Sequence, residues 1–462
     1  MTGLPLSQLV LVAHLTATVT GIAAILLLTR RVPVPHWRSA LLAAGCVALA
    51  IATFLASDPP RIFQDFRIAY FPAGRAALDN PGMLRALTGM GVSGFVNMPV
   101  VAYLFAPLAV LPMSTAMALF MISGLVATGL AWAVLARLAA LDVQARWLLA
   151  LLFAASGPLQ YSVKEGNTSH FILLALAAGL ALLRARRPAM AGALLGFAAI
   201  IKPPLLLFAV FFALRRDIRG LTGFAASCLT LGAASVALFG WSENLHWLQV
   251  CVLQFSHRWL AAFNVQSIPA FLIRFDAATA LLRDWNSYPP PSELLLPARM
   301  LIAALFFLAG MAALNSTLGA DKALRAARLT PQFLMVLCLS VLASPLSWSH
   351  YYCWLLMPTA FFLGSRARIP RWMRVCGWAA IVLMTPLVRP LAFSESWATI
   401  IYKDIGVSHL LFAGLLWFAV VAWQLCRSST FAATAIPSER TAARHHPLPS
   451  SGYSEPSRPL PS

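Results

Sequence analysis

Residues 39–57 read SALLAAGCVALAIATFLAS, a stretch without a single charged side chain. A helix needs about 20 apolar residues to cross about 30 Å of hydrocarbon, and this stretch is close to that length. Similar runs recur along all 462 residues, of which 60% are hydrophobic and only 11% are charged. A water-soluble fold could not cover so much apolar surface. Because the runs do not alternate as barrel strands do, the sequence predicts an all-α, polytopic membrane helical bundle.

The apolar runs predict about 11–13 transmembrane helices. The approximate spans are 8–29, 39–57, 113–136, 147–160, 169–183, 189–201, 203–214, 220–240, 297–315, 331–343, 351–363, 375–391 and 408–426. The first run has no basic residue before it and no convincing cleavage site, which favours a retained span over a signal peptide. We expect one membrane domain over 1–426, with long outer loops at 58–112, 241–296 and 392–407. The polar tail at 427–462 cannot bury a core and is predicted to be a disordered cytoplasmic segment.

The net charge of +19 is concentrated in short breaks between the apolar runs. The basic clusters are Arg30, Arg31 and Arg38; Arg184, Arg186 and Arg187; Arg215, Arg216 and Arg219; Lys322, Arg325 and Arg328; and Arg366, Arg368, Arg371 and Arg374. This distribution is the positive-inside signature of cytoplasmic loops and gives no reason to expect nucleic-acid binding. The alternate breaks carry mixed charge and are predicted to face outward, and Asp65 lies in one of them.

The clusters at 184–187 and 215–219 both look cytoplasmic, although only one apolar run separates them. Lys202-Pro203-Pro204 interrupts that run, and proline ends a helix at or before its neighbour. We therefore expect two short helices that enter and return, with Lys202 at the outer turn. Such broken helices are tolerated where they line a polar cavity. The alternative is one tilted, kinked span with one cluster assigned to the wrong side.

The outer loops contain further patterns. In the first, Phe66, Tyr70, Ala73 and Ala77 form one helical stripe, as in an interfacial helix that lies on the membrane surface. The second is rich in Trp and His, namely Trp241, His246, Trp247, His257 and Trp259. These aromatic residues fit an anchoring belt at the membrane interface or a platform for a sugar.

A few polar side chains remain near the predicted outer face. They are Asp65, Arg67, Lys164, Asn167, His170, Lys202, Gln266, Ser347 and His350. Each alone is more often a helix cap or a side chain that snorkels to the interface. Together on one face they indicate a functional site, because ionisable groups near membrane spans are costly. The seven cysteines are scattered without a Cys-x-x-Cys pair, and no phosphate-binding glycine loop, zinc motif or nucleophile elbow is present.

The order of several short motifs resembles glycosyltransferase family 87, the polyprenyl-phosphate-sugar-dependent mannosyltransferases of the GT-C class. The motifs are Asp65-Phe66 with Tyr70, Asn97-Met98-Pro99, Phe105-Ala106-Pro107-Leu108, Gly166-Asn167-Thr168-Ser169, Ala191-Gly192, Lys202-Pro203 and Ser344-Pro345-Leu346-Ser347-Trp348-Ser349-His350. The resemblance covers about 60–365. The chain departs from the family pattern where Gly166-Asn167 replaces Gly-Gln and Met98-Pro99 replaces Pro-Pro, and an additional amino-terminal span precedes the usual start.

The resemblance implies an inverting hexosyltransferase that moves a sugar, expected to be mannose, from a polyprenyl phosphate to a lipid or glycan acceptor. It implies action at the outer, periplasmic face of the cell (inner) membrane, without a metal or other cofactor. Asp65 matches the aspartate that serves as the base, and inversion needs one such carboxylate. Lys202 and His350 match motif positions near the leaving phosphate. Arg67 and Lys164 are further candidates by their chemistry alone.

A transporter or flippase for a lipid carrier or sugar is the alternative from another functional class. It would share the polytopic form and the charged residues. It would also predict internal repeats and polar residues on both sides of the membrane midplane. The sequence has no clear repeat and gathers its polar residues near one face, which favours the enzyme.

Overall fold

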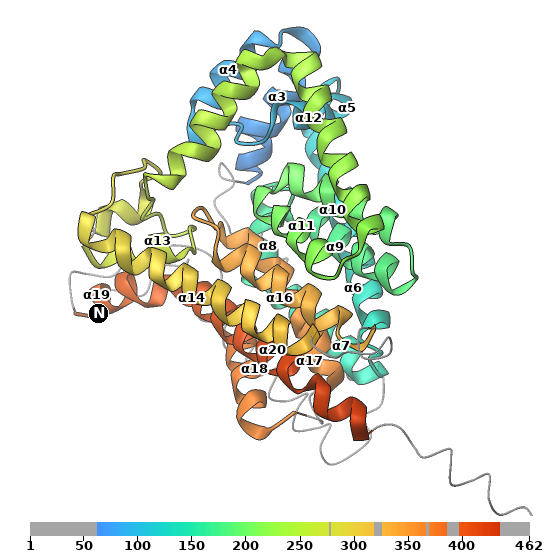
Figure 1. Cartoon of the computed structure of the whole chain (residues 1–462). Coiled ribbons are helices and arrows are strands. Elements are labelled where there is room, and N and C mark those ends of the chain that lie inside the picture. The colour runs from blue at the N-terminus through green and yellow to red at the C-terminus, as the bar shows by residue number, and fades with distance from the viewer. Residues whose placement is uncertain (1–61, 277–278, 318–325, 366–368, 386–396, 435–462) are drawn as a thin grey trace, which may run out of the picture.

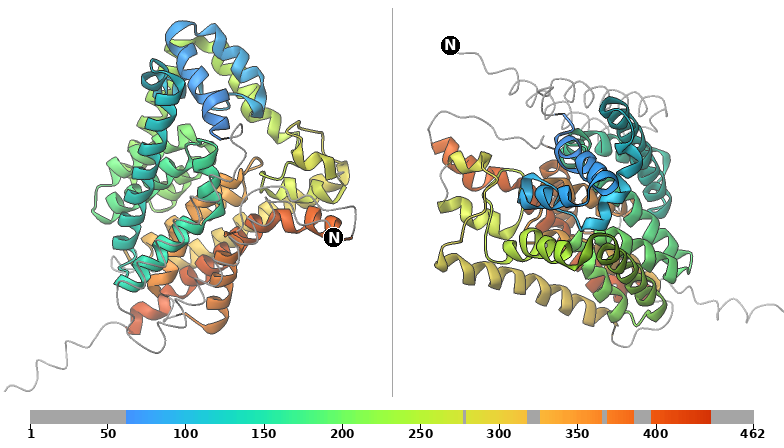
Figure 2. Two further views of the ribbon diagram at one scale, coloured as in Figure 1. Left: turned by 180° about the vertical axis from the view of Figure 1, so that it is seen from behind. Right: turned by 90° about the horizontal axis from the view of Figure 1, so that it is seen from above.

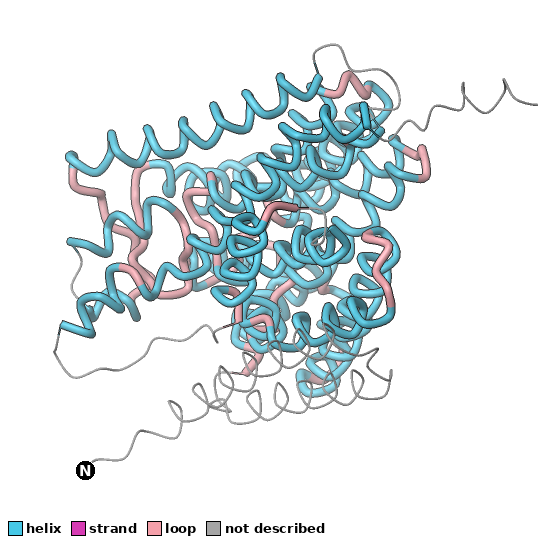
Figure 3. The backbone as a smooth tube through the Cα atoms, turned by 90° about the horizontal axis from the view of Figure 1, so that it is seen from below, coloured by secondary structure: helices cyan, strands magenta, loops and turns pink. Residues whose placement is uncertain are grey.

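The computed structural model describes residues 62–276, 279–317, 326–365, 369–385 and 397–434. Within these ranges the chain is helical, with two isolated β-bridges and no strand (Figure 3). The helices long and apolar enough to cross a membrane in this part are Met113–Leu138, Ile218–Phe255, Ser292–Ala313 and Ile400–Cys426. The prediction of an all-α polytopic membrane protein is confirmed. The predicted spans at 8–29 and 39–57 and most of the tail lie outside the described residues.

The first long helix, α6 (Met113–Leu138), leads into α7 (Val143–Ala155) and α8 (Gly157–Lys164). The sequence predicts a single span at 147–160, and this prediction is wrong. Ser156 takes an extended conformation with φ −66° and ψ 111°, and its hydroxyl caps α8 by accepting from the Leu159 N–H. Pro158, at the start of α8, has no N–H to continue the bonding of α7. This break turns the chain, so that α8 carries Tyr161 and Lys164 toward the outer loops.

Helices α9 (Ser169–Arg184) and α10 (Pro188–Ile201) pack together and are followed by the 3₁₀ turn η5 (Pro203–Leu207) and α11 (Phe208–Leu214). The chain then continues into α12 (Ile218–Trp247). A Cβ added at Gly192, near the start of α10, would lie 2.0 Å from the Gly220 carbonyl oxygen, and one at Gly220 would lie 2.3 Å from the Phe212 ring. The end of α11 therefore returns to the level at which α10 begins. The predicted pair of short helices with Lys202 at the turn is confirmed in its geometry.

The two basic clusters that flank this pair meet at the same end of the bundle. Arg184 donates to the Thr330 hydroxyl at 2.8 Å, and Arg215 donates to Gln332. Both acceptors lie in α16 (Leu329–Leu342). Because one helix start receives both arginines, a single kinked span, which would separate the clusters, does not fit the structure.

The first outer loop forms the apex of the molecule, where its short helices lie against the far end of α12 (Figure 1). Its elements are η2 (Phe66–Tyr70), α3 (Phe71–Asp79), α4 (Gly82–Gly89), η3 (Gly91–Ser93), η4 (Pro99–Leu104) and α5 (Ala106–Ala109). The predicted stripe faces inward. The ring centroids of Phe66 and Phe120 are 4.8 Å apart, and Tyr70 is stacked on Phe105 with ring centroids 4.6 Å apart. The stripe therefore packs against protein and not against a membrane surface.

The second outer loop runs from the end of α12 through η6 (Leu248–Val252), η7 (Leu253–Ser256), α13 (Ile268–Asp276) and η8 (Thr279–Arg283) to α14 (Ser292–Thr317). The buried Arg274 pins it by donating to the carbonyl oxygens of Ala261 and Ala262 at 3.0 and 2.7 Å and to Ser408 Oγ at 2.8 Å. The loop is thus an ordered structure at one end of the bundle (Figure 2).

The remaining elements complete the bundle. They are η9 (Ser349–Leu355), α17 (Leu356–Ser365), α18 (Arg371–Leu383), α19 (Trp397–Asp404), η10 (Gly406–Ser408) and α20 (His409–Thr434). Helices α14, α16 and α20 lie side by side (Figure 1). Helix α18 ends at Leu383, and the end of the predicted span 375–391 lies outside the described residues. Helix α20 continues to Thr434, into the segment that the sequence assigns to the tail.

Candidate active site

Asp65 is positioned by a backbone clamp between the start of the first outer loop and the turn after α8. The Phe63 N–H donates to the Lys164 carbonyl at 2.7 Å, and the Phe66 N–H donates to the Glu165 carbonyl at 3.3 Å. Asp65 lies between these two contacts, directly before a π-helical turn, a geometry often found at functional sites. The clamp holds its carboxylate beside the residues that follow α8.

Two residues of the clamp have the left-handed backbone conformation. Phe63 has a φ of 59° although it is not glycine, and Gly166 has a φ of 66°. A Cβ at Gly166 would lie 2.8 Å from both the Phe63 ring and Phe66 Cβ. Such strained positions persist only where the surroundings hold them. Glycine at 166 is therefore what allows the two segments to approach this closely.

Asn167 joins Asp65 to Lys202 through its side-chain amide. The Ser169 N–H donates to Asn167 Oδ1 at 3.1 Å, which fixes the amide with its NH₂ group toward Asp65. That group donates to Asp65 Oδ2 at 2.6 Å and to the Tyr70 hydroxyl oxygen at 3.2 Å. On the other side, Lys202 Nζ donates to Asn167 Oδ1 at 3.1 Å. One amide thus joins a carboxylate and an amine, so that three distant parts of the chain meet at this point.

The shared surroundings change the protonation equilibria of both charged groups. Burial raises the pKa of Asp65 above its ordinary value of 3.8, although the Asn167 hydrogen bond and the Lys202 charge act in the opposite direction. Burial lowers the pKa of Lys202, in the connection between α10 and η5, to about 8, while the Asp65 carboxylate opposes this shift. A carboxylate with a raised pKa is a stronger base, and both groups change charge nearer to neutral pH.

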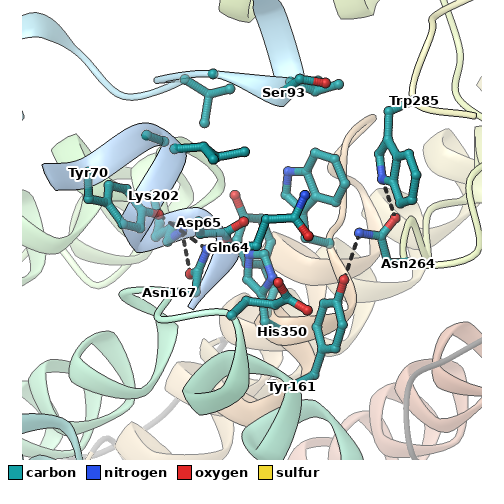
Figure 4. A pocket seen from close by; sticks show the side chains of 18 residues that line it. Gln64, Asp65, Tyr70, Ser93, Tyr161, Asn167, Lys202, Asn264, Trp285 and His350 are labelled. Atoms are coloured by element: carbon teal, nitrogen blue, oxygen red, sulfur yellow. Dashed lines mark hydrogen bonds between the residues drawn. The ribbon is translucent and has the colours of Figure 1, made fainter. Parts of the chain in front are cut away.

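A cavity of about 160 Å³ opens beside these groups (Figure 4). Asp65, Asn167, Lys202 and His350 line it. The His350 ring is stacked between the Tyr161 and Trp348 rings, with centroids 6.3 and 6.2 Å away. Within the described part of the chain, neither His350 ring nitrogen has a hydrogen-bond partner. This histidine is therefore oriented by its neighbours, and its two ring nitrogens are buried without a hydrogen-bond partner among the described residues.

The opposite wall of the cavity is a chain of polar and aromatic side chains. Trp285 Nε1 donates to Asn264 Oδ1 at 3.0 Å, and Asn264 Nδ2 donates to the Tyr161 hydroxyl oxygen at 3.1 Å (Figure 4). Aromatic walls with a few fixed polar groups are typical of small-molecule sites. A carboxylate, an amine and a histidine thus face a wall suited to a polar ring.

The other five candidates lie outside this cavity. Arg67 is exposed, and Lys164 forms an ion pair with Glu165 at 3.5 Å. His170 is buried against Gly124 of α6, and its Nδ1 is 2.9 Å from Oγ of Ser162 in α8. The Gln266 N–H donates to the Ser347 carbonyl at 2.6 Å, so these two residues join the second outer loop to the segment before η9. None of these five residues lines the cavity.

Sequence reasoning did not select several residues that line the cavity. They are Gln64, Tyr70, Tyr161, Glu165, Asn264, Trp285, Trp348 and Tyr351, among others. The sequence did indicate a platform for a sugar in the second outer loop, which contains Trp285. The tryptophans named for that platform, however, did not include Trp285. Trp247 and Trp259 of that loop are buried, whereas Trp241 is 69% exposed.

The model of glycosyltransferase family 87 matches residues 95–345, more than half of the chain. The chain belongs to glycosyltransferase family 87. Asn167 and Lys202 lie inside the matched residues, whereas Asp65 lies well before them and His350 lies shortly after them. This membership confirms the resemblance found in the sequence and favours a glycosyltransferase over a transporter.

This family 87 glycosyltransferase is 27% identical over 239 residues to a protein of Mycolicibacterium smegmatis (strain ATCC 700084 / mc(2)155). That protein is a polyprenol-phosphate-mannose-dependent alpha-(1-2)-phosphatidylinositol mannoside mannosyltransferase. The similarity covers 51% of each chain, so this chain spans about half the length of the relative it matches. No solved structure matches the chain.

Proposed function

We propose that this glycosyltransferase moves a mannosyl group from a polyprenyl-phosphate donor to an acceptor hydroxyl with inversion of the anomeric carbon. The observation that carries the proposal is the bridge of Asn167 between Asp65 and Lys202 on the cavity wall. It places one base and one cation in the same small space. The mannosyl donor of the Mycolicibacterium smegmatis relative supports the choice of sugar and carrier.

The residues account for each part of the reaction. Asp65 takes the proton of the acceptor hydroxyl as its oxygen forms a bond to the anomeric carbon. The bond between that carbon and the phosphate oxygen breaks at the same time, and polyprenyl phosphate leaves with the bonding electrons. The Lys202 ammonium offsets the negative charge that develops on this phosphate, as positioned cations do in such transition states. His350 lines the same cavity, and a ring nitrogen that has no partner among the described residues forms a further hydrogen bond to the substrate once the ring adjusts to it.

We place the reaction at the outer face of the cytoplasmic membrane. Lys202 lies at the turn between α10 and η5, at the opposite end of these helices from Arg184 and Arg215. If the arginine end is cytoplasmic, as the positive-inside rule expects, the cavity opens on the outer side. The polyprenyl chain would then lie between apolar helices while its phosphate reaches Lys202.

The donor test uses the purified full chain in lipid nanodiscs with an alkyl mannoside acceptor. Synthetic polyprenyl-phosphate mannose and GDP-mannose are supplied in parallel reactions. We expect transfer from the lipid-linked donor alone, and a product whose anomeric configuration, read by NMR, is opposite to that of the donor. Transfer from GDP-mannose, or a product that retains the donor configuration, would contradict the proposal.

A further inference from the structure

A second cavity of about 490 Å³ adjoins the first. One wall is the loop from Gly89 to Ser93, and the other is formed by residues of the second outer loop near 250–258 and 285–288. Val92, Ser93 and Trp285 line both cavities. Figure 4 shows Ser93 and Trp285 at the edge of the first cavity. A molecule that reaches Asp65 can therefore extend past this boundary into the second space.

The far wall of the second cavity is held by a network of specific contacts. Trp259 and Tyr288 exchange backbone hydrogen bonds of 2.8 and 2.9 Å, which align the two segments of the loop. Arg258 Nε then donates to the Ser287 carbonyl and hydroxyl oxygens, each at 3.1 Å, and Gln254 Nε2 donates to the same hydroxyl at 2.9 Å. The polar groups are thus fixed before any ligand arrives.

The chemistry of this wall differs from that of the first cavity. Among the described residues that line it, Arg258 carries a positive charge and none is acidic. The rings of Phe255, Trp285 and Tyr288 lie among hydroxyl and amide groups. Aromatic faces and fixed polar groups together suit a sugar ring, which has apolar C–H faces and a rim of hydroxyl groups.

We propose that the second cavity binds the penultimate sugar of the acceptor, so that the natural acceptor is a glycan of at least two units. The terminal unit presents its hydroxyl to Asp65 in the first cavity, and the next unit lies between Met90, Arg258 and Trp285. This inference rests on the proposed transferase function, because it assigns Asp65 to the acceptor hydroxyl.

The test compares an alkyl monomannoside with the matching alkyl dimannoside, both with synthetic polyprenyl-phosphate mannose as donor. For the unchanged enzyme we expect kcat/KM to be roughly 10- to 100-fold higher for the dimannoside than for the monomannoside. A gain of this size is typical of added hydrogen bonds to a charged group. Arg258→Ala should remove most of this ratio. Met90→Trp should do so as well, since it fills the cavity while it leaves the contact between Arg258 and Ser287 intact.

The matched control is Arg283→Ala, an exposed arginine in the same loop that lines neither cavity. It should keep the ratio of the unchanged enzyme. Equal kcat/KM for the two acceptors, or a ratio that survives in both Arg258→Ala and Met90→Trp, would overturn the subsite while transfer itself still supports the enzyme. If the enzyme transfers mannose to neither the monomannoside nor the dimannoside, both proposals are overturned together.

Discussion

The two ends of the helical bundle both carry basic side chains, and the ends use them differently. At the cavity end, Lys202 is buried and meets Asp65 through the amide of Asn167. At the opposite end, Arg184 donates to the Leu138 carbonyl and the Thr330 hydroxyl, so it joins helix ends. Burial beside a carboxylate shifts the pKa of a basic side chain. Contacts that join helix ends, as those of Arg184 do, mainly set how the helices pack and how the protein is oriented.

The hollows at the two ends differ in the same way. The groove beside Arg215, about 260 Å³ in volume, is walled mostly by apolar side chains of α11, α14 and α16. The cavity beside Asp65 brings acid, base and amide groups from distant segments to one surface. A charged side chain near a membrane span can therefore take part in chemistry when other elements bury it next to a partner. Matched substitutions at the two ends of the bundle test this difference.

The largest effect is expected at Asp65. Asp65→Asn keeps the shape of the side chain but cannot accept the acceptor proton, so kcat should fall by roughly 10²–10⁴-fold. At the opposite end, Asp217 caps α12 by accepting from the Gly220 N–H at 3.0 Å. Asp217→Asn should leave kcat within about twofold, because asparagine caps about as well. Steady-state transfer by the purified variants checks both values, and near-normal turnover by Asp65→Asn would defeat the mechanism.

The next effect concerns the donor phosphate. Lys202→Met and His350→Ala should each lower kcat/KM for the lipid donor by roughly 30- to 1,000-fold, equivalent to about 2–4 kcal/mol of transition-state stabilisation. Arg215→Met removes a cation at the other end of the bundle. It should change kcat/KM for the lipid donor by less than about fivefold, because surface contacts of charged side chains are weak. If Lys202→Met and His350→Ala both transfer at near the normal rate, these side chains have no role at the phosphate.

The dependence of kcat/KM on pH should reflect the titration of both Asp65 and Lys202. The base must be deprotonated, so kcat/KM should rise with pH through a pKa above 3.8, the ordinary value for Asp65. Lys202 must be protonated, so kcat/KM should fall as pH rises through about 8. Lys202→Arg should move the alkaline limb upward, because a guanidinium stays protonated. An alkaline limb that is identical in both proteins would assign it to another group.

A smaller effect is expected from two glycines. Gly166→Ala places a Cβ 2.8 Å from Phe63 and Phe66 at a positive φ, which should cost about 1–3 kcal/mol and displace Asp65. Gly232 of α12 has no atom within 4 Å of an added Cβ, so Gly232→Ala should raise stability by up to about 1 kcal/mol. Thermal unfolding of the two variants measures the difference. Equal midpoints would show that the clamp tolerates a side chain.

The last prediction concerns the side of the membrane that each segment faces. Reporters fused after Arg187 and after Arg219 should both report the cytoplasm, since α10 and α11 enter and return. A single reactive cysteine placed at Lys202 should be labelled from outside by a membrane-impermeant reagent. Fusions that report opposite sides would contradict the orientation proposed for the cavity.

The sequence alone determined the fold class, the paired short helices around Lys202 and four of the residues that meet at the cavity. Membrane insertion depends on the length and charge of local segments, which are visible residue by residue. The break at Ser156 was missed although the sequence carries a signal for it, because Ser156 caps α8 and Pro158 cannot continue the hydrogen bonding of α7.

Only the tertiary structure decided which polar residues share one space. Lys164 and Asn167 lie three positions apart in the sequence, yet Lys164 pairs with Glu165 while Asn167 bridges Asp65 and Lys202. Trp285 and Arg258 belong to no sequence motif that indicated a site. The backbone pairing of Trp259 with Tyr288 aligns the segments that carry them around the second cavity. Side-chain direction in loops depends on contacts with residues far along the chain, and no local pattern encodes those contacts.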